Sequence, residues 1–533
     1  MGLVETAAEN ISFRSVVGFA CAALVLNYVV GRLNEHIRIK RLGNYGRQLK
    51  SWAPLGLDRV AQAVNTTMKQ KNLELWREDY FKNATNWTAE TRIFNQRIVF
   101  TADPENMKAI LALQFSDYGK GEPFHEEWKD FLGDSIFTTD GPQWHASRQL
   151  IRPQFTRDRV SDLYCFESHM KTLFRAIDNL GPLNGEDQKV EPGAGSGKVI
   201  DISQLFFRYT LDVTTEFLLG QDTKSLSTPK NEFAEAFNEV QRVQNIIART
   251  SKARKLIPKA SFWKGLDMMN TFINRYIQRA LRLSPEELES HSKGDKGYNF
   301  LHALAGFTRD PKVLRDQIVA ILLAGRDTTA STLSWTIYEL SRHPHAVAKL
   351  REEILTTIGR DRMPTYEHLK NMPYLRAVLN ETLRLYPSVP FNVRLALKDT
   401  TLPRGGGPNG DEPLAILKDT PIAYSTLVMQ RRPDLYPPAS DTFAHPEVYS
   451  PERWAVWHPK PHDYIPFNAG PRICIGQQFA LTEMSYVLCR LFQRFDRVES
   501  HMYPIDGGNP LLKADIVLSP GQGVKVAFFD AQD

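Results

Sequence analysis

The sequence predicts a mainly α-helical protein with smaller β-sheets, preceded by one N-terminal transmembrane helix. Lys312–Arg342 is a long helical pattern that ends at His343-Pro344, because the residue before a proline disfavours helical geometry. Gln477–Phe492 is a largely apolar, helix-forming run, whereas Arg92–Thr101 alternates as a β-strand does. The apolar run Val16–Val30 comes close to the ~20 residues that span a bilayer.

Composition limits the class of protein. Of 533 residues, 42% are hydrophobic and 24% charged, which is ordinary for a globular enzyme. The net charge of +5 is too small to indicate a nucleic-acid partner. Four cysteines do not form a disulfide framework, so we expect a reducing compartment. We find no low-complexity linker or internal repeat that would divide the chain.

The N-terminal segment is predicted to anchor the protein in a membrane. We expect a short lumenal stretch at 1–12, a transmembrane anchor at 13–30, a basic linker at 31–55 and one large domain at 56–533. Basic side chains follow the apolar run, with Glu35 the only acid up to residue 50, so the large domain should lie in the cytosol. A cleaved signal peptide is the alternative, but the acidic start lacks a basic n-region.

The next elements are read from turn and cap residues. Asp103-Pro104 should cap a helix that runs through Leu113. The aromatic, Gly-rich stretch Tyr118–Asp140 has no clear period and reads as a loop. Gly141-Pro142 then opens a helix on which Trp144 and Arg148 share one face at i and i+4.

The middle of the chain begins with a polar insertion at Leu183–Gly197. It imitates a phosphate-binding loop, but Pro192 replaces the first glycine and Val199 the Ser/Thr that would hold magnesium, so we reject nucleotide binding there. Val199–Leu219 reads as an amphipathic helix, and helical segments continue to about Arg282.

Several later segments carry chemistry or turn signals. Ala324-Gly-Arg-Asp-Thr-Thr329 places a glycine and two threonines inside the long helix, a local weakness of the kind found at functional sites. Glu381 and Arg384 form an i,i+3 pair, which is a common surface feature when it stands alone. Ser388–Arg394 should form a strand edge, and Thr401–Gly410 a hairpin-like loop.

The segment Phe467-Asn-Ala-Gly-Pro-Arg-Ile-Cys-Ile-Gly476 organises the rest of the chain. Cys474 stands between a glycine-rich turn and a helix start, where unpaired N–H groups should lower the thiol pKa and favour an anionic ligand. Gly470 and Gly476 let the backbone approach a flat partner, and Arg472 can pair with an anionic group. A buried structural cysteine is the alternative reading.

This segment resembles the haem-binding loop of the cytochrome P-450 family at every defining position, Phe-x-x-Gly-x-Arg-x-Cys-x-Gly. The resemblance implies that fold and haem b, with Cys474 as the axial thiolate of the iron. It implies that Asp327 and Thr328 relay protons for dioxygen cleavage, and that Glu381, Arg384 and Arg453 lock the core beneath the haem loop. It also assigns the following residues to cofactor binding, several of them through the haem propionates: Trp144, Arg148, Arg394, Phe467, Gly470, Arg472 and Gly476.

Four stretches look like one branch of that family, the fungal microsomal hydroxylases of n-alkanes and fatty acids. They are Thr401–Gly410, Phe467–Gly470, Gln477–Glu483 and Ala324–Thr329. The resemblance implies an endoplasmic reticulum membrane protein that hydroxylates a long aliphatic chain at or near its terminal carbon. The alternatives are a tailoring hydroxylase of a fungal secondary metabolite, a haem-thiolate isomerase or dehydratase, and a non-catalytic haem-binding sensor.

The expected reaction inserts one oxygen atom of O2 into a C–H bond and releases the other as water. No flavin or nicotinamide fingerprint is present, so the resemblance implies electrons from NADPH delivered by NADPH–cytochrome reductase. A basic face with Arg148, Arg152, Arg157 and Arg159 could dock its acidic surface. A small apolar substrate should contact an apolar lining. The expected lining residues are Val319, Leu322, Leu323, Ala324, Val389, Phe391, Val393, Val517 and Leu518.

Overall fold

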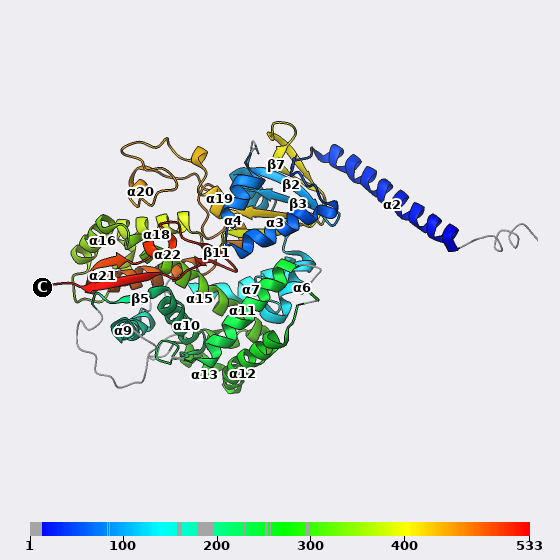
Figure 1. The fold of residues 1–533 in the computed structure, drawn as a ribbon. Coiled ribbons are helices and arrows are strands. Elements are labelled where there is room, and N and C mark those ends of the chain that lie inside the picture. Colours follow the sequence, from blue (N-terminus) through cyan, green and yellow to red (C-terminus); the bar gives the residue numbers. More distant parts are fainter. Residues whose placement is uncertain are drawn as a thin grey trace, which may run out of the picture.

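The computed structural model confirms the predicted fold class: helices dominate (Figure 1), and the part of the chain that it describes holds four smaller β-sheets. It describes residues 13–532 apart from 83, 85, 157–162, 180–195, 229, 251–253, 256 and 294–298. The expected lumenal stretch at 1–12, most of the polar insertion at Leu183–Gly197, and Arg157 and Arg159 therefore lie outside the described residues.

The N-terminal helix α2 runs from Phe13 to Leu42 and projects away from the body of the molecule (Figure 1). Its apolar part is exposed, and it is long and apolar enough to cross a membrane by length and composition. The helix does not end at residue 30, so residues 31–42 of the expected linker are helical. Ion pairs tie this end to the body, through Arg38 with Asp399 at 2.7 Å and Glu35 with Arg92 at 2.5 Å.

A six-stranded sheet lies next to α2, with the strand order β1-β2-β3-β9-β6-β4. The expected single strand Arg92–Thr101 is instead a hairpin, because Phe94 and Asn95 turn with positive φ. The expected strand at Ser388–Arg394 forms three residues later, as β6. The strands are β1 Arg47–Gln48, β2 Thr88–Ile93, β3 Gln96–Thr101, β4 Tyr118–Gly119, β6 Phe391–Ala396 and β9 Pro421–Ser425.

Smaller sheets complete the β structure. The predicted hairpin around Thr401–Gly410 is confirmed as β7 and β8, which pair antiparallel. The expected helix at Val199–Leu219 begins with a short strand, β5, that pairs with β13 near the C-terminus. The remaining strands are β5 Val199–Asp201, β7 Thr400–Gly406, β8 Glu412–Ile416, β10 Phe495–Ser500, β11 Leu512–Ala514, β12 Leu518–Pro520 and β13 Lys525–Asp530.

The helices surround α15, which confirms the predicted long helix with bounds Pro311–Leu340. Most of its side chains are buried. The other helices are α3 Leu57–Met68, α4 Asn72–Glu74, α5 Pro104–Lys108, α6 Gly121–Leu132, α7 Gly141–Ile151, α9 Tyr164–Asn179, α10 Ile202–Leu219, α11 Glu232–Thr250, α12 Ala260–Arg282, α13 Pro285–Lys293, α14 Phe300–Ala305, α16 Pro344–Thr357, α17 Tyr366–Lys370, α18 Pro373–Leu385, α19 Thr426–Met429, α20 Arg453–Val456, α21 Gln477–Arg494 and α22 Tyr503–Asp506.

Two local predictions have different outcomes. Asp103 caps α5 as expected, because its Oδ1 accepts from the backbone N–H groups of Glu105 at 3.0 Å and Asn106 at 3.1 Å. The expected loop Tyr118–Asp140 is wrong, since α6 occupies much of it. Aromatic and charged residues form an amphipathic helix there. The glycines at its two ends obscured the helical period in the sequence.

Candidate active site

The segment Phe467–Gly476 is a closed loop that leads into α21. The Cys474 N–H donates to the carbonyl oxygen of Phe467 at 2.9 Å and closes the loop. Gly470 has a φ of 66°, and a Cβ there would lie 1.8 Å from the Leu111 carbonyl oxygen, so only glycine fits. At Gly476 the φ is −90°, and the nearest atom to an added Cβ is 3.7 Å away on Phe155. Neither the backbone conformation nor the neighbouring protein atoms require glycine at 476. A requirement for glycine would therefore come from a ligand bound beside it.

The Cys474 thiol is exposed although protein atoms surround it closely. Both facts hold together if the sulfur faces an internal space. Burial raises the pKa of the thiol, while the Gly476 N–H and the nearby Arg148 oppose that rise. The prediction that the thiol pKa of Cys474 is lowered is therefore wrong. Desolvation raises this pKa by more than the N–H donor and Arg148 lower it. A cationic partner is needed to hold this sulfur as a thiolate.

Cationic side chains gather beside this loop. Arg472 donates to Asp140 at 2.6 Å and to the Thr139 carbonyl oxygen at 2.8 Å, and its guanidinium lies 4.7 Å from the centroid of the Trp144 ring. Its Nε is buried and has no partner. Burial and the neighbouring Arg394 lower the pKa of Arg472 to about 10. Arg148 donates to the Ile473 carbonyl oxygen at 3.1 Å, which places it at the same loop.

Lys120 belongs to this group, although no motif in the sequence indicated it. Burial lowers its pKa well below the ordinary value, and Arg394 and Arg472 lower it further, against the opposing effect of Asp140. Lys120 follows β4, which pairs with β6 in the register Tyr118↔Ala396 and Gly119↔Leu395, so it stands opposite Arg394. Only this tertiary pairing reveals it. Lys120 and Arg472 lie beside Asp140, and Arg394 and Arg148 lie near Arg472. The cluster therefore has an excess of positive charge, which fits an anionic ligand.

The middle of α15 carries a hydroxyl and a buried ion pair. Thr328 Oγ1 donates to the Ala324 carbonyl oxygen at 2.7 Å, one turn earlier, and the helix stays continuous despite the expected weakness. Asp327 pairs with Arg326 at 3.1 Å. Burial raises the pKa of Asp327, and Arg326 and Gln241 oppose the rise. Both charged residues line a cavity of about 860 Å³.

The expected apolar lining is only partly brought together. Thr332 on α15 bonds Ser388 at 2.9 Å, and the Leu518 N–H donates to the Ser388 carbonyl oxygen at 3.0 Å, so three of the segments meet. Val389 and Val393 keep accessible surface. Val319, Leu322, Leu323 and Leu518 are buried among protein atoms. Ala324 and Phe391 are half-buried, and of the nine expected residues Val517 alone borders the 860 Å³ cavity.

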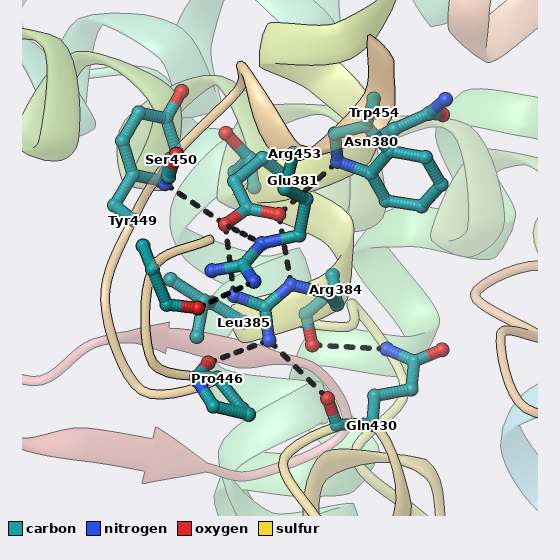
Figure 2. Close-up of polar contacts among 12 residues, drawn as sticks. Asn380, Glu381, Arg384, Leu385, Gln430, Pro446, Tyr449, Ser450, Arg453 and Trp454 are labelled. Carbon is teal, nitrogen blue, oxygen red and sulfur yellow. Dashed lines mark hydrogen bonds and ion pairs between the residues drawn. The ribbon is translucent and has the colours of Figure 1, made fainter. Parts of the chain in front are cut away.

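Glu381, Arg384 and Arg453 form one buried cluster, as Figure 2 shows. Glu381 accepts from Arg384 Nε at 2.8 Å and from Arg453 Nε at 3.0 Å, and from the Trp454 indole at 3.1 Å. Each of the three charged side chains is fully buried. Arg384 also donates to the Pro446 carbonyl oxygen at 2.6 Å, so the cluster ties α18 to the chain that precedes α20.

Comparison with known proteins decides the family. The family description "Cytochrome P450" matches residues 69–520. The chain belongs to the cytochrome P450 family. It is 60% identical over 528 residues to "Cytochrome P450 monooxygenase pvhE" of Talaromyces variabilis, covering 99% of this chain and 97% of that protein. It is 40% identical to "Cytochrome P450 52A12" of Debaryomyces hansenii, covering 92% and 93%, and 41% identical to "Cytochrome P450 52A1" of Candida tropicalis, covering 87% and 84%.

A solved structure supports the fold of this P450. The chain matches "Crystal structure of cytochrome P450DA heme domain" with a TM-score of 0.74 at 19% identity, covering 92% of this chain and 99% of that one. The protein is therefore a P450 monooxygenase, and its family implies a haem whose iron binds a thiolate. The exposed thiol of Cys474, the excess of cations and the partnerless Nε of Arg472 fit that iron and the haem propionates.

Proposed function

We propose that this P450 hydroxylates a long aliphatic chain, an alkane or a fatty acid, at or near its terminal carbon. The observation that carries the haem site of this proposal is the exposed Cys474 thiol beside a cluster of four cationic side chains, Lys120, Arg148, Arg394 and Arg472. The motif resemblance to the fungal alkane and fatty-acid hydroxylases supports the choice of substrate, as does the similarity to the 52A relatives over most of the chain.

In this proposal Cys474 binds the iron of haem b, and the cations hold its propionates. Arg472 offers its unused Nε, while Lys120, Arg148 and Arg394 supply further charge. Trp144 packs against Arg472 and fixes its plane. When bound, the haem supplies the activation of O2 for insertion into a C–H bond.

Asp327 and Thr328 are proposed to move protons toward the distal side of the haem. Because burial raises its pKa, Asp327 can hold a proton near neutral pH more readily than an exposed carboxyl does. Its partner Arg326 keeps it oriented, and both side chains border the 860 Å³ cavity. Thr328 stands one residue later with a hydroxyl that already donates within the helix.

The electron donor and the location follow from the same family likeness. We propose NADPH–cytochrome reductase as the partner, docking on a face that includes Arg148 and the exposed Arg152. We propose that α2 anchors the protein in the endoplasmic reticulum membrane. Its apolar side chains are exposed, and a lipid bilayer would remove them from water. The basic residues after the span would lie on the cytosolic side.

A second candidate is a tailoring hydroxylase of a fungal secondary metabolite. It is kept because "Cytochrome P450 monooxygenase pvhE", at 60% identity, is more similar to this chain than the 52A relatives at 40% and 41%. The haem and proton-delivery residues would serve that substrate equally well. The apolar lining also fits an alkyl group on a larger molecule.

The spectrum of the reduced carbon monoxide complex tests the ligand. We expect the red-shifted absorption of thiolate-ligated haem, its loss in Cys474→Ser, and its retention in Cys489→Ser and Cys165→Ser. A normal spectrum in Cys474→Ser would refute the assignment of the axial ligand.

Turnover with reductase and NADPH tests the substrate. A panel of alkanes and fatty acids of increasing chain length is incubated, and the hydroxyl is located by mass spectrometry. Terminal or near-terminal products support the proposal. Mid-chain products contradict the position of oxidation, and failure of every chain together with normal spectra would favour the second candidate.

A further inference from the structure

A group of side chains that can bind a metal lies outside the haem loop, on α9 and α10. Cys165 and His169 stand at i and i+4 on α9, and Glu216 faces them from α10. One ligand atom from each of the three, the Sγ, a ring nitrogen and a carboxylate oxygen, lies within 4.8 Å of the other two. Spacing of i,i+4 places two ligands on one helix face, a common arrangement in zinc proteins.

The contacts within the group are already short. His169 Nε2 lies 2.5 Å from Glu216 Oε2, and the ring is nearly buried. Cys165 Sγ donates to the Val213 carbonyl oxygen on α10 at 3.9 Å, which directs the sulfur toward the same helix. Glu216 keeps 32% of its side chain exposed, so an ion can reach the group from solvent.

The other ring nitrogen of His169, Nδ1, lies near the carboxylate of Asp222. Asp222 Oδ2 lies 4.0 Å from Nδ1. Asp212 accepts from the Ser225 N–H at 2.7 Å, the Leu226 N–H at 2.8 Å and the Thr223 hydroxyl at 2.7 Å, which fixes the loop that follows Asp222. Metal-binding histidines almost always have such a partner on the second nitrogen, because it sets the tautomer and the ring orientation.

We propose that Cys165, His169 and Glu216 form a zinc site, with a water molecule as the fourth ligand. One sulfur, one imidazole nitrogen and one carboxylate oxygen suit Zn²⁺ better than the hard cations Mg²⁺ and Ca²⁺. Binding forms bonds from the metal to Sγ, Nε2 and Oε2. It releases to solvent the thiol proton and the proton that His169 shares with Glu216. The thiolate and the carboxylate then balance the charge of the ion.

The simpler reading is an ion pair of a protonated His169 with two carboxylates. That reading gives Cys165 no part and predicts no retained metal. A matched surface control exists in the described part of the chain: Glu122, His125 and Glu126 form a similar group without sulfur, and there His125 lies 2.8 Å from Asp134. The site would join α9 to α10, next to the contact between Phe166 and Phe479 at the start of α21.

The test uses the full-length holoenzyme. Under the proposed ligation, Cys474 binds the haem iron there and is not free to bind zinc. The protein is incubated with ZnCl2, dialysed against a weak chelator and measured for zinc and iron by mass spectrometry. We expect one zinc per chain. Cys165→Ala and His169→Gln should lose it, Asp222→Asn should weaken binding about 10–100-fold, and His125→Gln should leave it unchanged. Zinc retained equally in His169→Gln would overturn the proposal.

The unaltered protein gives a second readout that does not depend on how the variants fold. X-ray absorption at the zinc edge should show one sulfur at ~2.3 Å together with nitrogen or oxygen ligands. Zinc should also slow the alkylation of Cys165, read by peptide mass, and it should not do so in His169→Gln. A shell of nitrogen and oxygen alone, no bound zinc, or unprotected Cys165 would overturn the site. These readouts concern residues outside the haem loop, so their failure leaves the proposed hydroxylation standing.

Discussion

The guanidinium of Arg472 lies 4.7 Å from the centroid of the Trp144 ring while its buried Nε has no partner. The terminal nitrogens of Arg472 already donate to Ile136, Thr139 and Asp140, so its Nε is the donor left for a further acceptor. In a P450 the propionates of the haem are acceptors of the right charge.

Arg472→Gln should therefore weaken haem binding without abolishing folding. The loss of a charged hydrogen bond should raise the rate of haem dissociation by about 10-fold or more. The rate is measured by transfer of haem to excess apomyoglobin. Arg242→Gln, in an exposed pair with Glu239 at 2.7 Å, is the control and should behave as the unaltered protein. Equal haem loss in both variants would argue against a propionate contact.

Glu381→Gln should destabilise the fold strongly. The change leaves Arg384 and Arg453 buried with their carboxylate partner gone, at a cost of about 3–5 kcal/mol. The midpoint of thermal unfolding and the haem content report the loss. Glu239→Gln, whose carboxylate pairs at the surface, should cost only about 0–1 kcal/mol.

The same cluster should lose its effect in acid. Burial raises the pKa of Glu381, but Arg384 and Arg453 lower it more, so it lies below the ordinary value of 4.5. Its contribution to stability is complete above that value and disappears as the pH falls through the folded pKa. An unfolding midpoint in Glu381→Gln that stays as high as in the unaltered protein would contradict the cluster's role.

Glu127 should give the opposite dependence on pH. Burial raises its pKa to about 7, against the effect of Arg254, so the folded state binds a proton that the unfolded state has lost. Stability should fall as the pH rises from about 4.5 to 7, and Glu127→Gln should flatten this part of the profile. The thermal midpoint is measured across that window, with Glu126→Gln, which is half-buried and pairs with Lys129, as the control. A parallel profile in Glu127→Gln would contradict the shift.

Thr328→Ala should separate electron use from product formation. Removal of the hydroxyl should leave haem binding intact but lower product per NADPH by about 10-fold or more, with peroxide released instead. Thr328→Ser keeps a hydroxyl that can donate to the Ala324 carbonyl oxygen and should retain coupling. Equal product yield in Thr328→Ala would mean that Thr328 serves only the helix.

Phe391→Ala should move oxidation inward along an aliphatic chain. Phe391 packs against Trp76 with ring centroids 5.0 Å apart, so its ring is held in place as a wall. A terminal C–H bond is stronger than an internal one, and a steric difference of only ~1–3 kcal/mol selects between neighbouring carbons. Product positions are read by mass spectrometry. Phe307→Ala, at an exposed site, is the control, and unchanged products in Phe391→Ala would remove Phe391 from the substrate channel.

Local sequence was sufficient for the parts of this protein that depend on chain neighbours. The loop Phe467–Gly476 could be read directly, because a glycine turn, a cysteine and a helix start are contiguous. The cap at Asp103 and the long helix α15 followed for the same reason. Trp144 and Arg148 also lie one helical turn apart, so their shared face was predictable. Phe94 and Asn95 show the limit of this reading, since their turn divides one alternating run into two strands.

The tertiary structure decided what depends on distant pairings. The pairing of β4 with β6 brings Lys120 to Arg394, and no local pattern could supply that register. The direction of the pKa shift of Cys474 depended on burial, which raises the pKa, and on the Gly476 N–H and Arg148, which lower it. Burial was the larger effect. His169 met Glu216 and Asp222 only when α9 packed on α10. Motifs in sequence specify side-chain chemistry, whereas packing sets the desolvation and the charge partners that determine how that chemistry is used.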